Sequence, residues 1–170
     1  MTKTPKTLYA EADEVDGKLV WSIDDKPPTK KGEKKTIDFP KNTGEYDVTI
    51  KFTDKTKRGI IFNQASPLYV QEGGQCPPQT GINSTEIPAN SVVAGADSLG
   101  FTNLNQKDCR LVYQLNFVDS KNRDFALDPD FKNGGTGGRA LGAAAIVTII
   151  VAGTALLVLV ALTSMGKLGH

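Results

Sequence analysis

Apolar and polar residues alternate along several short runs in the first 128 residues, which is typical of strands with one buried face. In 45–52 every second residue from Tyr46 is apolar, and in 109–118 every second residue from Leu111 is apolar. Runs of similar character predict further strands at 7–12, 18–23, 35–39, 59–63, 68–71, 91–94 and 125–127.

Clusters of Gly, Pro, Asn and Asp separate these runs and predict turns between them. No window of ten or more residues before residue 139 carries the apolar stripe of a helix. Strands recurring every ~8–15 residues predict an all-β domain over residues 1–133, an antiparallel immunoglobulin-like β-sandwich. We expect Trp21 to fill the core between the sheets, and the alternative is an exposed anchor.

The stretch 72–106 interrupts this regular pattern. It is rich in Gly, Pro, Asn, Gln and Ser and contains no Lys or Arg. We interpret it as a long, mostly irregular excursion from the sandwich. Loops of this length are usually either functional or disordered, so it is a candidate contact surface.

A long uncharged segment follows the sandwich. Residues 140–165 contain no charged side chain, and as a helix they would measure ~39 Å against ~30 Å of bilayer hydrocarbon. This predicts a single C-terminal transmembrane α-helix. The alternative, a buried core helix, would show a polar stripe. Residues 134–139 are predicted to form a Gly-rich hinge, and residues 166–170 a short tail.

Small residues line one side of this predicted helix. Close packing of small residues is what brings helices together in lipid, so the face predicts contact with other membrane subunits rather than a mere anchor. The packing residues are Gly138, Gly142, Ala145, Thr148, Ala152 and Ala155.

The charges around the helix suggest its orientation. No apolar targeting run follows Met1, so the chain is expected to be tail-anchored. Four basic residues, Lys121 to Arg139, precede the helix and Lys167 follows it. The positive-inside rule then predicts a single-pass membrane protein with its N-terminal domain in the cytoplasm.

The end of the sandwich carries a short motif. The strand 109–118 is followed by Asp128-Pro129 and then by Asn133. This ending resembles the bacterial DP-EP family over about residues 7–133. The resemblance implies a small β-domain of bacterial origin without an established activity, and the helix is an addition to it. Together with the predicted helix, a bacterial origin implies the bacterial inner (cytoplasmic) membrane as the location.

The residue types argue against catalysis. His170 is the sole histidine, so a histidine-based dyad or a catalytic zinc site lacks its ligands. We expect no enzyme activity, no cofactor and no metal. Cys76 and Cys109 are either two free thiols, the default in the cytoplasm, or a disulfide that ties the excursion to a strand.

Charge is distributed unevenly along the chain. Residues 1–138 hold all 19 acidic and 18 of the 20 basic residues, a net charge of −1 that excludes a nucleic-acid partner. Within them, residues 26–58 hold ten basic and five acidic side chains. This segment is either a solvated face or a contact with anionic lipid headgroups or an acidic partner. Its centre is Lys30, Lys31, Lys34 and Lys35.

These features predict a non-catalytic accessory subunit of a bacterial integral-membrane complex. The helix would pack laterally against the other subunits and the β-domain would cap one side. A photosynthetic reaction-centre or light-harvesting assembly is the favoured setting, and a respiratory assembly is the other. The alternative is a free-standing tail-anchored adaptor whose β-domain binds a soluble partner.

Overall fold

The computed structural model describes residues 2–33, 36–73, 78 and 80–135. The chain divides into two units, 1–139 and 140–170, and every described residue belongs to the first. Within the described residues no helix combines the length and apolarity that crossing a membrane requires. The predicted transmembrane helix at 140–165 lies outside the described residues.

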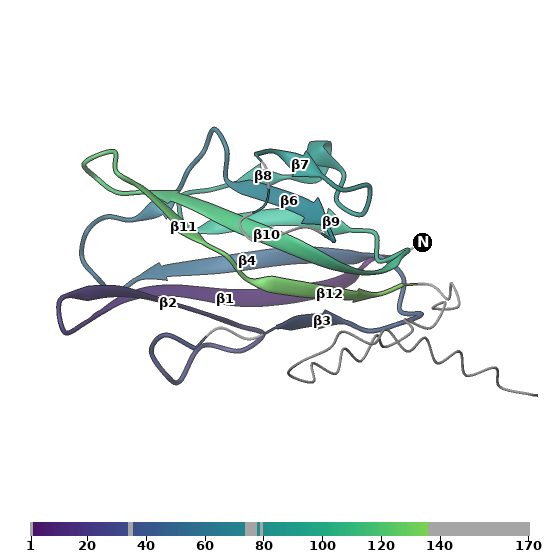
Figure 1. Ribbon diagram of the computed structural model, residues 1–170, viewed down its shortest axis with the longest axis horizontal. Coiled ribbons are helices and arrows are strands. Elements are labelled where there is room, and N and C mark those ends of the chain that lie inside the picture. The colour runs from purple at the N-terminus through teal and green to yellow at the C-terminus, as the bar shows by residue number, and fades with distance from the viewer. Residues whose placement is uncertain (1, 34–35, 74–77, 79, 136–170) are drawn as a thin grey trace, which may run out of the picture. The chain divides into compact units, whose positions relative to one another are not determined.

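The described residues form two β-sheets that pack as a sandwich (Figure 1). The first sheet has the strand order β2-β1-β4-β9-β8. Its strands are β1 (Thr4–Val15), β2 (Lys18–Asp24), β4 (Tyr46–Asp54), β8 (Val93–Ala94) and β9 (Ser98–Asn103), and the 3₁₀ helix η1 (Ala89–Ser91) precedes β8.

The second sheet has the order β3-β12-β10-β6-β7, and both β5 and β11 also pair with β10. It is therefore built around β10, the longest strand of this sheet. The strands are β3 (Ile37–Phe39), β5 (Ile61–Phe62), β6 (Leu68–Glu72), β7 (Ile82–Asn83), β10 (Asp108–Val118), β11 (Asp124–Leu127) and β12 (Asp130–Gly134).

The β-sandwich is confirmed, but the expectation of wholly antiparallel pairing is wrong. Among the described strands, three pairs are parallel: β1 with β4, β12 with β3, and β6 with β7. The chain path explains the first of them. After the β1–β2 hairpin the chain crosses to the second sheet to form β3, and it returns as β4 beside β1 in the same direction. Alternation marks which face of a strand is buried, and it carries no information on the direction of the neighbour.

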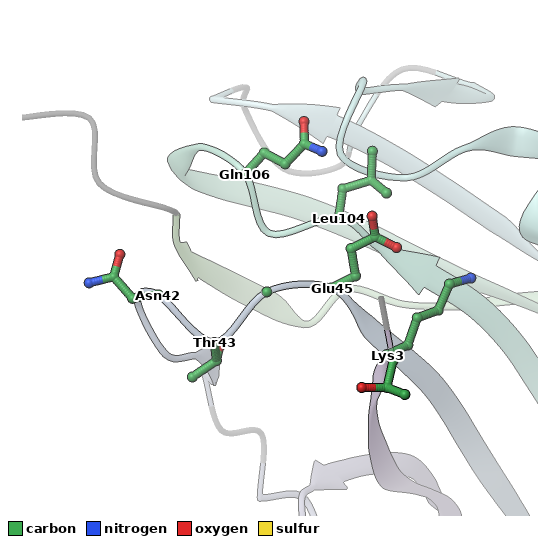
Figure 2. Close-up of a pocket in the computed structure, with 8 residues that line it drawn as sticks. Lys3, Asn42, Thr43, Glu45, Leu104 and Gln106 are labelled. Carbon is green, nitrogen blue, oxygen red and sulfur yellow. The ribbon is translucent and has the colours of Figure 1, made fainter.

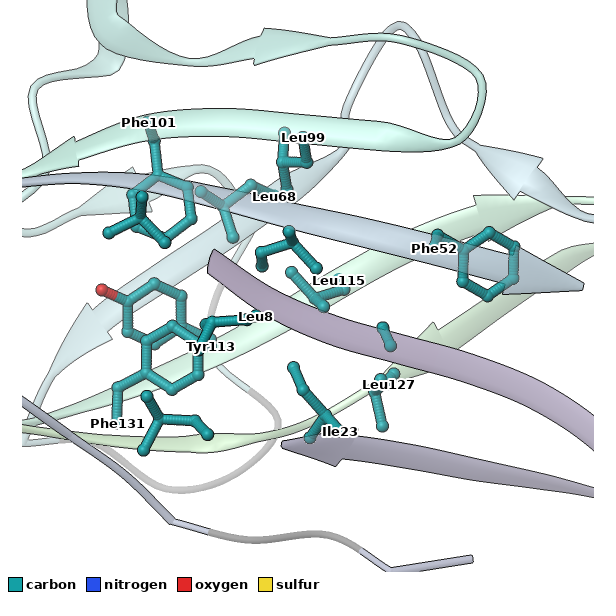
Figure 3. Close-up of a cluster of buried hydrophobic side chains, with 14 of the residues drawn as sticks. Leu8, Ile23, Phe52, Leu68, Leu99, Phe101, Tyr113, Leu115, Leu127 and Phe131 are labelled. Carbon is teal, nitrogen blue, oxygen red and sulfur yellow. The ribbon is translucent and has the colours of Figure 1, made fainter. Parts of the chain in front are cut away.

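The core lies between the sheets, where the predicted alternation is confirmed (Figure 3). Every second residue of β4 from Tyr46 to Phe52 is buried, and so is every second residue of β10 from Leu111 to Phe117. Trp21 packs at the edge of this core, half-buried, with its ring centroid 4.8 Å from that of Phe117. Its predicted role in core packing is confirmed.

The stretch 72–106 is more ordered than the sequence indicates. It contributes β7, β8 and β9, and β9 pairs with the whole first half of β4. Leu99 and Phe101 of β9 are fully buried in the core. The expectation of an irregular excursion is wrong for β9, because Gly100 and Asn103 give this strand a weak intrinsic β signal.

Candidate functional site at the C-terminal end of the domain

Several loops meet at the end of the sandwich where the described chain ends. β1 and β4 begin at this end in parallel register, β9 ends beside the start of β4, and β10 begins beside the end of β12. The topology thus collects the N-terminal residues, the 40–45 loop, the 104–107 loop and Gly135 in one place.

Four buried polar side chains form a hydrogen-bonded cluster here, which we call the end network. Asn103 and Asn133 bond reciprocally, each amide nitrogen donating to the other's oxygen at 2.8 and 2.9 Å. Asn133 Nδ2 also donates to Glu86 Oε2 at 3.1 Å. Asn105 Nδ2 donates to the carbonyl of Pro40 at 3.0 Å, which links the network to the 40–45 loop. Its members are Glu86, Asn103, Asn105 and Asn133, each at most 1% exposed.

Glu86 brings a carboxylate into this buried environment. Its Oε2 accepts hydrogen bonds from the backbone N–H groups of Gln106 (2.7 Å) and Lys107 (3.3 Å) in addition to Asn133. Its own carbonyl accepts from Leu104 N at 2.8 Å. Hydrogen bonds from two backbone N–H groups of the 104–107 loop end on one Glu86 oxygen, so Glu86 fixes this loop.

The network also fixes the last described residues. Gly135 is buried, its N–H donates to Asn105 Oδ1 at 3.2 Å, and its carbonyl accepts from Asn42 N at 2.9 Å. Gly135 has a φ of +67°, and an added Cβ would overlap with the backbone N of Asp108. A Cβ on Gly134 would come within 2.5 Å of Lys41 N. The predicted hinge began at Gly134, whereas the structure places both glycines inside the folded domain.

A second polar cluster borders the network. Lys107 Nζ lies 3.0 Å from Glu72 Oε2, and Ser84 Oγ donates to Glu72 Oε1 at 2.9 Å. Burial raises the pKa of Glu72, but hydrogen bonds from Lys107 and Ser84 outweigh this and hold it below its usual value. The same Glu72 bond raises the pKa of Lys107. Both side chains therefore stay charged at neutral pH.

An open pocket of about 620 Å³ lies against this end of the domain, and we call it the end pocket. Figure 2 shows Leu104 and Gln106 on one side of it and the 42–45 loop on the other. Lys3 and Glu45 give it one charge of each sign, and Lys3 Nζ is held by Thr102 Oγ1 at 2.8 Å. The pocket offers polar contacts of both signs around an aliphatic side chain, which suits docking of a polar protein surface better than chemistry.

The predicted basic patch is placed only in part. Lys30 and Lys31 are exposed in the loop after β2, while Lys34 and Lys35 lie outside the described residues. The Lys31 ammonium is 2.9 Å from the carboxylate of Asp13 on β1. Part of the positive charge of this loop is therefore already neutralised within the domain.

Other basic residues of the segment 26–58 lie far from this loop or from one another. Lys41 precedes β4 and Lys55 follows it, so the nine-residue strand separates them by roughly 26 Å. Lys55 is paired with Glu11 at 2.7 Å, and Arg58 with Glu14 at 2.7 Å. The local excess seen in the sequence is thus distributed over both ends of the sandwich.

The remaining predicted positions fall mostly outside the described residues. This holds for Cys76 and for the helix-packing set of Gly138, Gly142, Ala145, Thr148, Ala152 and Ala155. Cys109 is a free, half-buried thiol. Burial, together with the nearby Glu86 and Glu72, raises the pKa of the Cys109 thiol to about 11.

Sequence reasoning missed the end network. Its four members are spread from residue 86 to residue 133. Polar residues are usually exposed, so nothing in their sequence pattern predicts that these four are buried together. One signal was present: Glu86 is the single charged residue between Gly73 and Ala96. Asn133 closes the motif that resembles the DP-EP family, and the structure gives it a contact with both Asn103 and Glu86.

Comparison of the chain with protein-family models gives no match, and comparison with curated proteins gives none either. The resemblance to the DP-EP family stays a prediction.

Proposed function

We propose that the chain is a non-catalytic accessory subunit of a bacterial integral-membrane complex. The apolar segment 140–165 crosses the membrane and packs laterally against other subunits and lipid, and the β-domain caps the complex on the cytoplasmic side. The segment's 26 uncharged residues and its small-residue face support this proposal.

The observation that carries the proposal is the fixed position of Gly135. Buried hydrogen bonds to Asn105 and Asn42 hold this residue, so only residues 136–139 remain for a connection to the predicted helix. Four residues reach at most ~14 Å when fully extended. The connection between the folded domain and the predicted helix is therefore short. A domain that has to dock on its complex in one orientation benefits from such a short connection.

The second candidate is a free-standing tail-anchored adaptor whose β-domain binds a soluble partner. The observation that favours it is the open end pocket with its Lys3 and Glu45 side chains. An adaptor has to reach a soluble partner but does not need a fixed orientation. Its function would therefore tolerate a longer connection between Gly135 and the predicted helix.

Native gels after mild-detergent solubilisation of host membranes separate the two proposals. The subunit should migrate with a large complex, and a pigmented complex would support the photosynthetic setting over a respiratory one. Inserting ten Gly and Ser residues after Gly135 should release the subunit from the complex. An adaptor would migrate as a small species, and the insertion would leave its partner binding intact.

The predicted helix face allows a matched pair of variants. Gly142→Leu should release the chain from the complex, because a bulky side chain prevents close approach of a neighbouring helix. Leu157→Phe, off that face, should be tolerated. Equal tolerance of both changes would show that the segment only anchors the domain.

Two finer predictions belong to this proposal. One is an immunoglobulin-like chain path for the sandwich, and the other is contact of Lys30, Lys31, Lys34 and Lys35 with anionic headgroups. The headgroup contact has the weaker support, because Lys31 already pairs with Asp13. Co-sedimentation with anionic vesicles, lost between low and physiological salt, would establish it.

A further inference from the structure

One segment of the chain, which contributes strands to both sheets, is nearly free of charge. Between Gly59 and Gln106 the chain carries three acidic residues and no basic one. Of these, Glu86 is buried in the end network and Glu72 is paired with Lys107. In a chain with 23% charged residues, the surface built by this stretch suits a neutral ligand.

A hollow of about 390 Å³ is lined partly by this segment and partly by β10 and β11, and its volume is within the ~300–1,000 Å³ range of small-molecule sites. Because Leu115 and Phe117 of β10 point into the core, Gln114 and Asn116 lie on the outer face of the second sheet. Tyr69 of β6 is directly opposite Gln114, and Ala126 of β11 is opposite Asn116. We call the hollow the sheet groove, and its polar lining is Asn63, Ser66, Tyr69, Gln114 and Asn116.

The amide groups of the sheet groove are held in place from below. Asn116 Nδ2 donates to the carbonyl of Ser66 at 2.8 Å, and Asn116 Oδ1 accepts from Gln114 Nε2 at 2.6 Å. Gln114 therefore keeps Oε1 as an oriented acceptor. Asn63 Oδ1 accepts from the backbone N–H groups of Ala65 (3.1 Å) and Ser66 (3.2 Å), which keeps its Nδ2 as an oriented donor.

The hydroxyl groups complete the set. Neither Tyr69 Oη nor Ser66 Oγ has a hydrogen-bond partner among the described residues, and each can both donate and accept. Ala126, which lies across β10 from Tyr69, adds a small side chain to the lining. The groove thus combines aromatic residues, of which Tyr69 lies on the outer face of the sheet and Phe117 and Phe125 are also in the lining, with uncharged donors and acceptors.

We propose that the sheet groove binds a neutral oligosaccharide. Sugar hydroxyls donate and accept in alternation, which the groups of Asn63, Ser66 and Gln114 match, and the C–H face of a pyranose packs on a ring such as Tyr69. An anionic ligand would lack a cation in this groove, whose one charged lining residue is Asp124 among the residues described. This binding is independent of the role proposed for the membrane segment.

Titration calorimetry on the full chain in a detergent without a sugar headgroup tests the proposal. The probes are hexasaccharides of β-1,4-glucose, α-1,4-glucose, β-1,4-xylose and β-1,4-N-acetylglucosamine. At least one should bind, with Tyr69→Ala weakening the affinity about tenfold or more and Gln114→Ala several-fold. Tyr69→Phe, which keeps the ring, should weaken it less than Tyr69→Ala.

Gln106→Ala, an amide of the end pocket, is the matched control and should leave the affinity unchanged. Trp21 fluorescence confirms that each variant is folded. The proposal is overturned if no probe binds at up to about 10 mM. It is also overturned if binding survives both Tyr69→Ala and Gln114→Ala, or if an oligogalacturonate binds more tightly than every neutral probe.

Discussion

Replacing Gly135 with alanine tests whether the end of the domain is locked as the structure shows. With φ at +67°, an alanine costs about 1–2 kcal/mol for the left-handed backbone alone. Its Cβ would also overlap with Asp108 N and stand 2.6 Å from the carbonyl carbon of Lys107. Both are backbone atoms, so Gly135 itself has to move.

That movement separates Gly135 from its two hydrogen-bond partners. The bonds to Asn105 (3.2 Å) and from Asn42 (2.9 Å) are each worth about 1 kcal/mol. The free energy of unfolding should therefore fall by about 3–4 kcal/mol in total, a large part of the ~5–15 kcal/mol of an ordinary domain.

Gly17→Ala is the matched control. Gly17 has a φ of +73° in the turn between β1 and β2, and nothing lies within 4 Å of an added Cβ. It should lose only the ~1–2 kcal/mol of the backbone effect. Urea unfolding of the full chain in detergent, followed by the fluorescence of Trp21, the single tryptophan, measures both variants. If both variants lost the same free energy of unfolding, Gly135 would not be held by its neighbours as the structure shows.

Three further predictions concern single side chains. Hydrogen bonds from Arg123 hold the pKa of Asp119 at about 2, below its ordinary 3.8, so its stabilising effect is present above about pH 4 and is lost as the pH falls toward 2. Asp119→Asn should therefore flatten the acid dependence of urea midpoints in this range. Tyr113→Phe should leave the unfolding free energy unchanged or raise it by up to ~1 kcal/mol, because the buried hydroxyl has no partner among the described residues; a clear loss in urea unfolding would contradict this. In a Cys76→Ser variant, Cys109 should react with iodoacetamide at pH 8 far more slowly than in urea, since its pKa of about 11 leaves little thiolate.

The sequence predicts the strands of this domain better than their pairing. Alternation in β4 and β10 specifies which side chains are buried, and those side chains do form the core. The neighbours of β1 depend on the return of the chain from the other sheet, and no local pattern encodes that return. β12 was missed as a strand because its five residues, 130–134, include an Asn-Gly pair that reads as a turn.

The candidate site was less predictable than the core. Asn103 and Asn133 become a reciprocal pair only once β4, β9 and β10 have brought β9 and β12 to the same end. As part of a Gly-rich segment, Gly134 and Gly135 predict a flexible hinge. In the fold they are glycines because the backbones of Lys41 and Asp108 leave no room for a Cβ. Glycine thus predicts flexibility from the sequence alone, whereas in the fold it marks close backbone packing.

The parallel pairing of β12 with β3 has a consequence for how the domain folds. Phe131 pairs with Ile37, and Thr4 pairs with Tyr46. The chain must therefore close long loops, at a cost in entropy, before these pairs can stabilise the folded domain. Domains dominated by such distant pairings fold on a timescale of milliseconds to seconds and expose unpaired edges in the meantime. The strand that completes the second sheet is also the last one described along the chain. Phe131 contacts the rings of Tyr113 and Phe39 in the folded domain. During synthesis, these two contacts can form only after nearly the whole domain has been made.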